Sequence, residues 1–205
     1  MLWARLAIAL LCCWAASAFA ADPWCRPGGA SALRFEWVPA SKAEPRVGSV
    51  RIADVSGKTV QVLDAVENYY GGSEPPLGRR EDFNNDGCPD LAVTNSVAGI
   101  GNESLAVFLY DPRTKRFEEN AALSGIGGLN VDAHDRNCVN GEWKGGAEDV
   151  YTSRHCWHRG KLVPIREYSV SPLYNRKGEL ACYEHVETTY RGGRKRTRTR
   201  CTQEF

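Results

Sequence analysis

The strongest constraint on the fold is that no segment of the chain shows a sustained helical period. Short runs rich in Val, Ile, Tyr, Phe and Thr alternate with clusters of Gly, Pro, Asn and Asp, which is typical of all-β chains. Ser56-Gly57 and Arg159-Gly160 have the composition of hairpin turns, and Pro112 favours a type I turn over Asp111–Thr114. This strand density predicts an all-β, disulfide-stapled single domain, an antiparallel sandwich or an incomplete propeller. We expect strands at 33–38, 47–53, 59–63, 91–96, 104–110, 150–157, 161–168, 180–190 and 194–202.

Residues 1–20 have the three parts of a cleaved signal peptide, which predicts export. Arg5 is followed by the apolar run Leu6–Trp14 and then by Ala18-Phe19-Ala20. The apolar run is shorter than the ~20 residues that a membrane span requires. Cleavage after Ala20 leaves residues 21–205 as one all-β domain. A lipid anchor through one of the two signal-peptide cysteines is the alternative, although neither follows the usual small residues.

Six cysteines remain after cleavage, and an even number in an exported chain predicts disulfides. Six cysteines allow fifteen pairings. Two pairs are favoured because their members flank turn signals: the pair around Gly145-Gly146 and the pair around Arg191–Arg194. The favoured pairs are Cys138–Cys156 and Cys182–Cys201, which leaves Cys25 with Cys88.

A run of oxygen-bearing side chains predicts a calcium site in the middle of the chain. Ca²⁺ takes roughly 6–8 oxygen ligands, and alternate acidic positions on a tight loop can converge on one ion. Gly87 suits the sharp turn that follows. The loop is not an EF-hand, because its twelfth position is Val93 rather than Glu. The same residues also suit an ordinary Asx-rich surface turn. The predicted ligands are the side chains of Asp82, Asn84, Asp86 and Asp90 and the backbone carbonyl of Cys88.

The charges are nearly balanced, with a formal net charge of +1, so nothing in the overall composition indicates nucleic acid as a partner. The exception is the C-terminal hairpin. Arg194, Arg196, Arg198 and Arg200 occupy alternate positions, which places them on one face of a strand. They suit a charged edge strand that blocks edge-to-edge pairing. They also suit a surface for an acidic partner or an anionic envelope polymer.

No motif predicts an enzyme: the chain has neither a Gly-x-Ser-x-Gly elbow nor a phosphate-binding loop, and no nucleophile accompanies its histidines. A different kind of site is indicated at Gly145-Gly146, which allows a tight protruding loop. Tyr151 stands at the shoulder of that loop, and Tyr is a frequent anchor in protein interfaces. The alternative is a hairpin tip with Tyr151 buried in the sheet.

Three segments in this order resemble one family of bacterial periplasmic proteins. They are Asp82–Leu91, Val107–Phe117 and Gly145–Leu162, within a similarity that spans residues 46–200. The family comprises calcium-binding, lysozyme-inhibitor-like proteins. Some of them are immunity proteins against lysozyme-like effectors of antibacterial type IV secretion systems. They are similar to the periplasmic inhibitors of invertebrate-type lysozyme.

The resemblance implies a periplasmic protein that binds a lysozyme-like peptidoglycan hydrolase and blocks its active cleft. In the family, a loop with a Ser-Gly pair and a following Tyr plugs the cleft. Gly146 and Tyr151 match that Gly and Tyr, whereas Gly145 stands where the family tends to have Ser. The competing interpretation is a calcium-stabilised structural or adhesion module of the envelope, with no hydrolase as its target.

Overall fold

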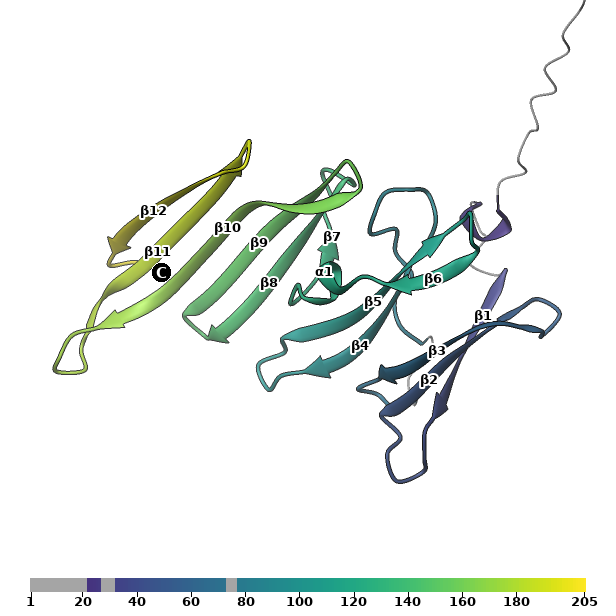
Figure 1. The fold of residues 1–205 in the computed structure, drawn as a ribbon. Helices are drawn as coiled ribbons and strands as arrows, with labels where there is room; N and C mark the ends of the chain where they lie inside the picture. The colour runs from purple at the N-terminus through teal and green to yellow at the C-terminus, as the bar shows by residue number, and fades with distance from the viewer. Residues whose placement is uncertain (1–21, 27–31, 73–76) are drawn as a thin grey trace, which may run out of the picture.

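A computed structural model describes residues 22–26, 32–72 and 77–205. The predicted signal peptide and the two cysteines considered for a lipid anchor lie outside these residues. The described chain forms twelve strands in three antiparallel sheets, a short 3-10 helix η1 (Pro23–Cys25) and one helical turn α1 (Ala121–Ser124) (Figure 1). The strands are β1 (Leu33–Pro39), β2 (Val47–Asp54), β3 (Thr59–Glu67), β4 (Leu91–Val97), β5 (Glu103–Asp111), β6 (Arg116–Glu119), β7 (Asn130–Val131), β8 (Cys138–Gly146), β9 (Asp149–His158), β10 (Lys161–Tyr174), β11 (Leu180–Arg191) and β12 (Arg194–Thr202).

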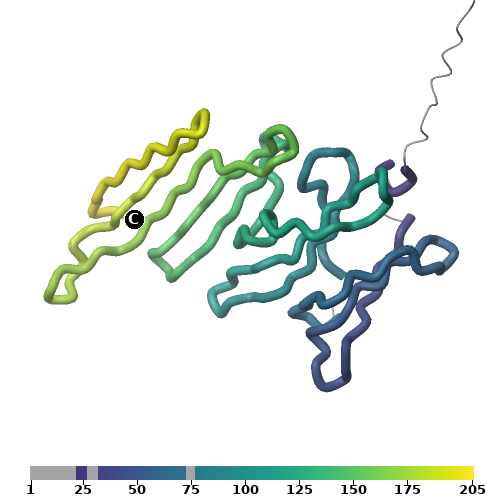
Figure 2. Tube along the Cα trace, in the orientation of Figure 1, coloured from purple at the N-terminus to yellow at the C-terminus, as the bar shows by residue number. Residues whose placement is uncertain are grey.

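The sheets follow one another along the chain, so that β1–β3 lie at one end of an elongated molecule and β12 lies at the other (Figure 2). The first sheet has the order β1-β2-β3 and the second β4-β5-β6. The third has six strands in the order β12-β11-β10-β9-β8-β7. Every pairing is antiparallel and neighbouring strands are mostly consecutive, as expected for a chain of hairpins.

The sheet β4–β6 is buried on both of its faces. Leu91 and Val93 point into a core shared with β2, β3 and Trp24. Ala92 points into a second core, shared with α1, Phe83 and β8. Since successive side chains of a strand alternate between faces, burial of both faces explains why Leu91, Ala92 and Val93 are apolar in succession rather than alternating with polar residues.

All three predicted disulfides are present: Cys25–Cys88, Cys138–Cys156 and Cys182–Cys201. The second joins directly opposite residues of β8 and β9, and the third joins β11 to β12. The first ties the N-terminal segment to the loop before β4. The prediction of an antiparallel, disulfide-bonded all-β fold is therefore confirmed. The described strands form open sheets rather than a closed barrel.

Each of the predicted strands exists, but β6, β7 and β8 were not predicted. The omission of β8 matters most, because that strand carries Gly145 and Gly146. Its three glycines argue against a strand by composition alone. One of them, Gly141, is required by packing, because a Cβ there would lie 2.5 Å from a methyl carbon of Ile126.

Candidate functional site

The predicted calcium loop, Asp82–Asp90, is ordered by its own side chains. The backbone N–H of Asp86 donates to Oδ1 of Asp82 at 3.1 Å and to Oδ1 of Asn84 at 3.2 Å. These two oxygens therefore converge on one point. Gly87 has φ +86°, so glycine is needed at the turn as expected. Its N–H donates to the second oxygen of Asp82 at 2.9 Å.

Asp90 is the fully buried acidic residue of the loop. One carboxylate oxygen accepts the N–H of Phe83 at 2.8 Å, and the other accepts the N–H of Tyr110 at 2.9 Å. The pKa of Asp90 is raised to about 7. Burial is the main cause, the two hydrogen bonds lower the pKa, and the nearby charges of Asp86 and Asp82 raise it. Among the described residues, no cationic side chain is paired with this carboxylate. The charged form of a buried carboxylate near two others is unfavourable, and a bound divalent cation would stabilise it.

The donor set fits calcium in its chemistry, because it consists of carboxylate, amide and carbonyl oxygens. The carboxylates of Asp82, Asp86 and Asp90 are, however, directed toward N–H groups of the protein. Their oxygens do not all lie within 4.8 Å of one another. Among the described residues, such a close group of possible ligand atoms is formed by Asp135, Cys138 and Cys156. It is no metal site, because the two cysteines are bonded to each other in a disulfide.

Three contacts from two parts of the chain anchor this loop. The disulfide between Cys25 and Cys88 holds it to the N-terminal segment, where the indole N–H of Trp24 donates to the carbonyl of Pro89 at 2.6 Å. On the other side, the indole N–H of Trp157, in β9, donates to the carbonyl of Phe83 at 2.7 Å. The loop thus connects the first two sheets to the six-stranded sheet. Nothing in the sequence pattern distinguished these two tryptophans from ordinary core residues.

The hairpin β8–β9 differs from the predicted glycine-tipped loop. Its two turn residues are Ala147 and Glu148, and both glycines are the last residues of β8. Neither has a positive φ. A Cβ on Gly145 would lie 2.1 Å from a carboxylate oxygen of Asp149, whose other oxygen accepts from Ser171 at 2.7 Å. A side chain at position 145 would therefore require the carboxylate of Asp149 to move.

Tyr151 lies near the start of β9, directly opposite Trp143 of β8 and Ser169 of β10. Directly opposite residues of a sheet share a face, so the two aromatic side chains are neighbours. Tyr151 is 39% exposed and Trp143 is 37% exposed, so Tyr151 is not a core residue. Partial burial and the charge of Glu167 raise the pKa of the Tyr151 phenol, and its hydroxyl interacts with the side chains of Ser153 and Glu167 on the same face. We call this pair of side chains the aromatic face.

The tip of this hairpin is held by three polar contacts. Asn102, in the turn between β4 and β5, donates to the carbonyl of Lys144 at 2.6 Å and accepts the N–H of the same residue at 2.9 Å. Tyr183 of β11 donates its hydroxyl to Glu148 at 2.6 Å. The aromatic face is therefore presented by a hairpin whose position is fixed from both sides.

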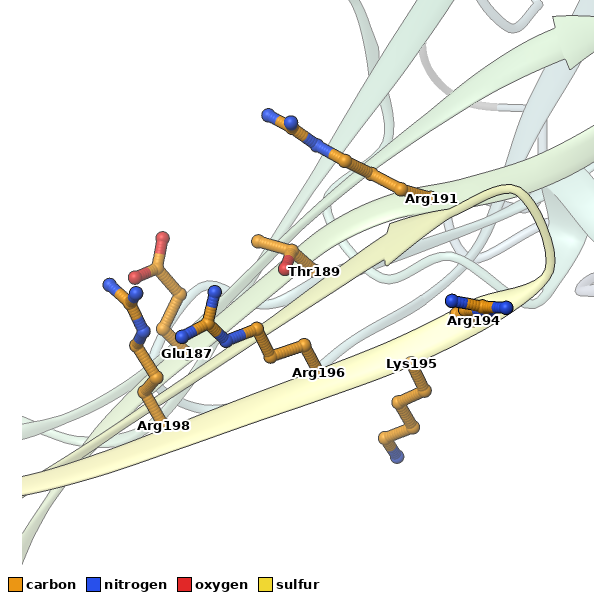
Figure 3. A pocket seen from close by; sticks show the side chains of 7 residues that line it. All are labelled: Glu187, Thr189, Arg191, Arg194, Lys195, Arg196 and Arg198. Carbon is orange, nitrogen blue, oxygen red and sulfur yellow. The ribbon is translucent and has the colours of Figure 1, made fainter.

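The arginine-rich C-terminal hairpin consists of β11 and β12. Its second strand is the outer edge of the six-stranded sheet, because β12 pairs only with β11 among the described strands. The prediction of a charged edge strand is confirmed. Arg191 of β11 lies opposite Arg194, and a groove of about 550 Å³ runs along this end of the hairpin (Figure 3). No helix of the described chain is long and apolar enough to cross a membrane.

The architecture defines this chain as a protein of open antiparallel sheets that contains three disulfides. No protein-family profile and no curated protein matches its sequence. Its fold is similar to that of a solved Xanthomonas protein described as related to a type IV secretion system, with a TM-score of 0.55 and 18% identity. The match covers 81% of this chain and 87% of the other. At this identity the likeness establishes a shared fold. The three disulfides indicate an oxidising, extracytoplasmic compartment.

Proposed function

We propose that this chain is a periplasmic inhibitor or immunity protein that binds a lysozyme-like peptidoglycan hydrolase and blocks its active cleft. The observation that carries the proposal is the aromatic face, Trp143 and Tyr151, exposed on a hairpin that Asn102 and Glu148 hold in place. The fold shared with a protein related to a type IV secretion system supports the proposal. Some members of the family that the sequence resembles are immunity proteins against effectors that such a system delivers.

The chemistry of the target suits such a plug. Lysozyme-type hydrolases cleave glycosidic bonds with a pair of carboxyl groups in a groove. A tyrosine ring inserted there excludes the sugar chain, and its protonated hydroxyl can donate a hydrogen bond to a catalytic carboxylate. Since the hairpin is already fixed in the free protein, little ordering entropy is lost on binding. Inhibition on this proposal is steric, and the inhibitor catalyses nothing.

We further propose that the loop Asp82–Asp90 binds Ca²⁺ through Asp82, Asn84, Asp86, the carbonyl of Cys88, and Asp90. When bound, the ion would supply a positive charge to the buried carboxylate of Asp90 and to the two acidic side chains beside it. Its role is structural, because the loop lies between the sheets. The ordered loop would keep β9, and with it Tyr151, in place through the contact from Trp157 to Phe83.

The test is lysis of peptidoglycan by a lysozyme-domain hydrolase, with this chain titrated in. Tyr151→Ala should weaken the complex by about 2 kcal/mol or more, which is roughly thirtyfold in the inhibition constant. The matched control is Tyr174→Ala, which removes an equally large ring that is 60% exposed elsewhere on the same sheet. It should inhibit like the wild type.

Two results would contradict the proposal. Full inhibition by a folded Tyr151→Ala protein would place the contact elsewhere on the surface. Absence of any inhibition by the wild type, combined with a calcium-dependent melting temperature, would favour the structural or adhesion module of the envelope.

A further inference from the structure

The end of the six-stranded sheet concentrates positive charge on one face. We call it the arginine face and define it by Arg191 of β11 and Arg194, Arg196 and Arg198 of β12. Figure 3 shows these side chains around Glu187 and Thr189, with Lys195 directed away from them. Lys195 instead lies over the ring of Tyr190, with its Nζ 5.9 Å from the ring centroid.

This charge is not neutralised within the protein. No carboxylate of the described residues lies within 4.0 Å of the four guanidinium groups. Among the described residues, Glu187 is the one acidic residue that lines the groove, and its carboxylate accepts a hydrogen bond from Nε of Arg166 in β10 at 2.8 Å. The groove therefore keeps the full charge of its arginines, although the whole chain has a net charge of only +1.

The arrangement costs stability rather than providing it. Arg191 and Arg194 are directly opposite each other, and like charges at such positions destabilise a sheet. The arginines of β12 follow one another at every second residue, about 6.7 Å apart along the strand. Charged side chains on an edge strand prevent pairing with the edge of another sheet, but this does not require four cations on the same face. This concentration points to a ligand that carries the complementary charge.

We propose that the arginine face is a binding site for an extended polyanion, a polymer with repeating phosphate or carboxylate groups. The planar fork of a guanidinium pairs with either group through two parallel hydrogen bonds. The groove is lined by Glu187, Thr189, Lys195 and the four arginines, with no apolar side chain among them. A folded protein partner needs an apolar interface core, and a lipid surface is usually bound with apolar or aromatic anchors. The row of evenly spaced cations instead matches a chain of evenly spaced anions.

The experiment measures binding of fluorescently labelled inorganic polyphosphate and of labelled polyglutamate to the whole mature protein by anisotropy. If four cations are neutralised at ~0.7 released ions each, affinity should fall ~50-fold between about 50 and 200 mM salt. The double variant Arg196→Gln/Arg198→Gln should show a ~7-fold fall, because two cations remain. Whichever polymer binds more tightly assigns the repeating group as phosphate or carboxylate.

The matched control is Arg176→Gln/Lys177→Gln, which removes the same charge from the exposed turn between β10 and β11. It should retain the ~50-fold salt response of the wild type. Equal salt dependence in the arginine-face variant and the wild type would overturn the proposal, as would failure of both polymers to bind. Binding to vesicles of anionic lipid but to neither polymer would also overturn it, in favour of a membrane surface. The proposal does not depend on inhibition of a hydrolase, which the arginine-face variant should retain.

Discussion

Replacement of Asn102 by Ala tests how the hairpin β8–β9 is held. The amide of Asn102 is 8% exposed and makes two hydrogen bonds to the backbone of Lys144, one as a donor and one as an acceptor. A typical intramolecular hydrogen bond contributes about 1 kcal/mol net, so the variant should lose about 2 kcal/mol of unfolding free energy. For a chain of this size that corresponds to a fall of about 4–8 °C in melting temperature.

Urea unfolding, followed by fluorescence with the calcium concentration fixed, measures the loss. The matched control is Asn140→Ala, because Asn140 lies on β8, the strand to which Asn102 is bonded, and its side chain makes no hydrogen bond with the described residues. That variant should differ little from the wild type. A loss below about 0.5 kcal/mol for Asn102→Ala, equal to that of the control, would show that the hairpin does not depend on this contact. It would also remove the reason for treating the aromatic face as preorganised.

Three further perturbations test other parts of the structure. Calcium at about 100 times its dissociation constant should add ~2.7 kcal/mol of stability, and Asp86→Ala should remove most of that gain; identical melting curves of the wild type in calcium and in chelator would refute the site. Gly145→Ser should lower the urea midpoint, because its Cβ displaces the carboxylate of Asp149, whereas Gly146→Ser, with open space around it, should not; equal midpoints would refute the steric argument. The Arg154 guanidinium and two backbone N–H groups hold the pKa of Asp132 at about 2, so its stabilising effect is present above pH ~4 and lost as the pH falls through 2. Asp132→Asn should therefore cost about 1 to 2 kcal/mol at pH 7, after allowance for solvent screening of Arg154, and much less at pH 2; a cost that does not depend on pH would refute the ion pair.

Local patterns in the sequence were sufficient for most strands and for the disulfides. Turn chemistry placed Gly57 and Gly160, both with positive φ, at the tips of the hairpins β2–β3 and β9–β10. The cysteine pairs of the two long hairpins followed from the turns that they flank. These features depend on residues close together in the sequence, which is why they could be predicted without knowledge of the packing.

Features that depend on distant contacts could not be predicted. Strand β8 has a glycine at position 141 because Ile126 approaches its backbone closely, and that contact leaves no mark on the local pattern. The hydrogen bond from Trp157 to the loop at Phe83 joins residues 74 positions apart. Likewise, the exposure of Tyr151 is set by which strands flank β9, so the sequence alone left burial and exposure equally open.

The order of the disulfides along the chain bears on how the protein acquires them. The six cysteines of the described residues are bonded in sequence order: Cys25 with Cys88, Cys138 with Cys156, and Cys182 with Cys201. If the chain enters an oxidising compartment with its N-terminus first, every cysteine meets its correct partner before a competing one has emerged. An oxidase that simply joins thiols in order of arrival then yields one pattern out of fifteen, without later reshuffling of mispaired bonds.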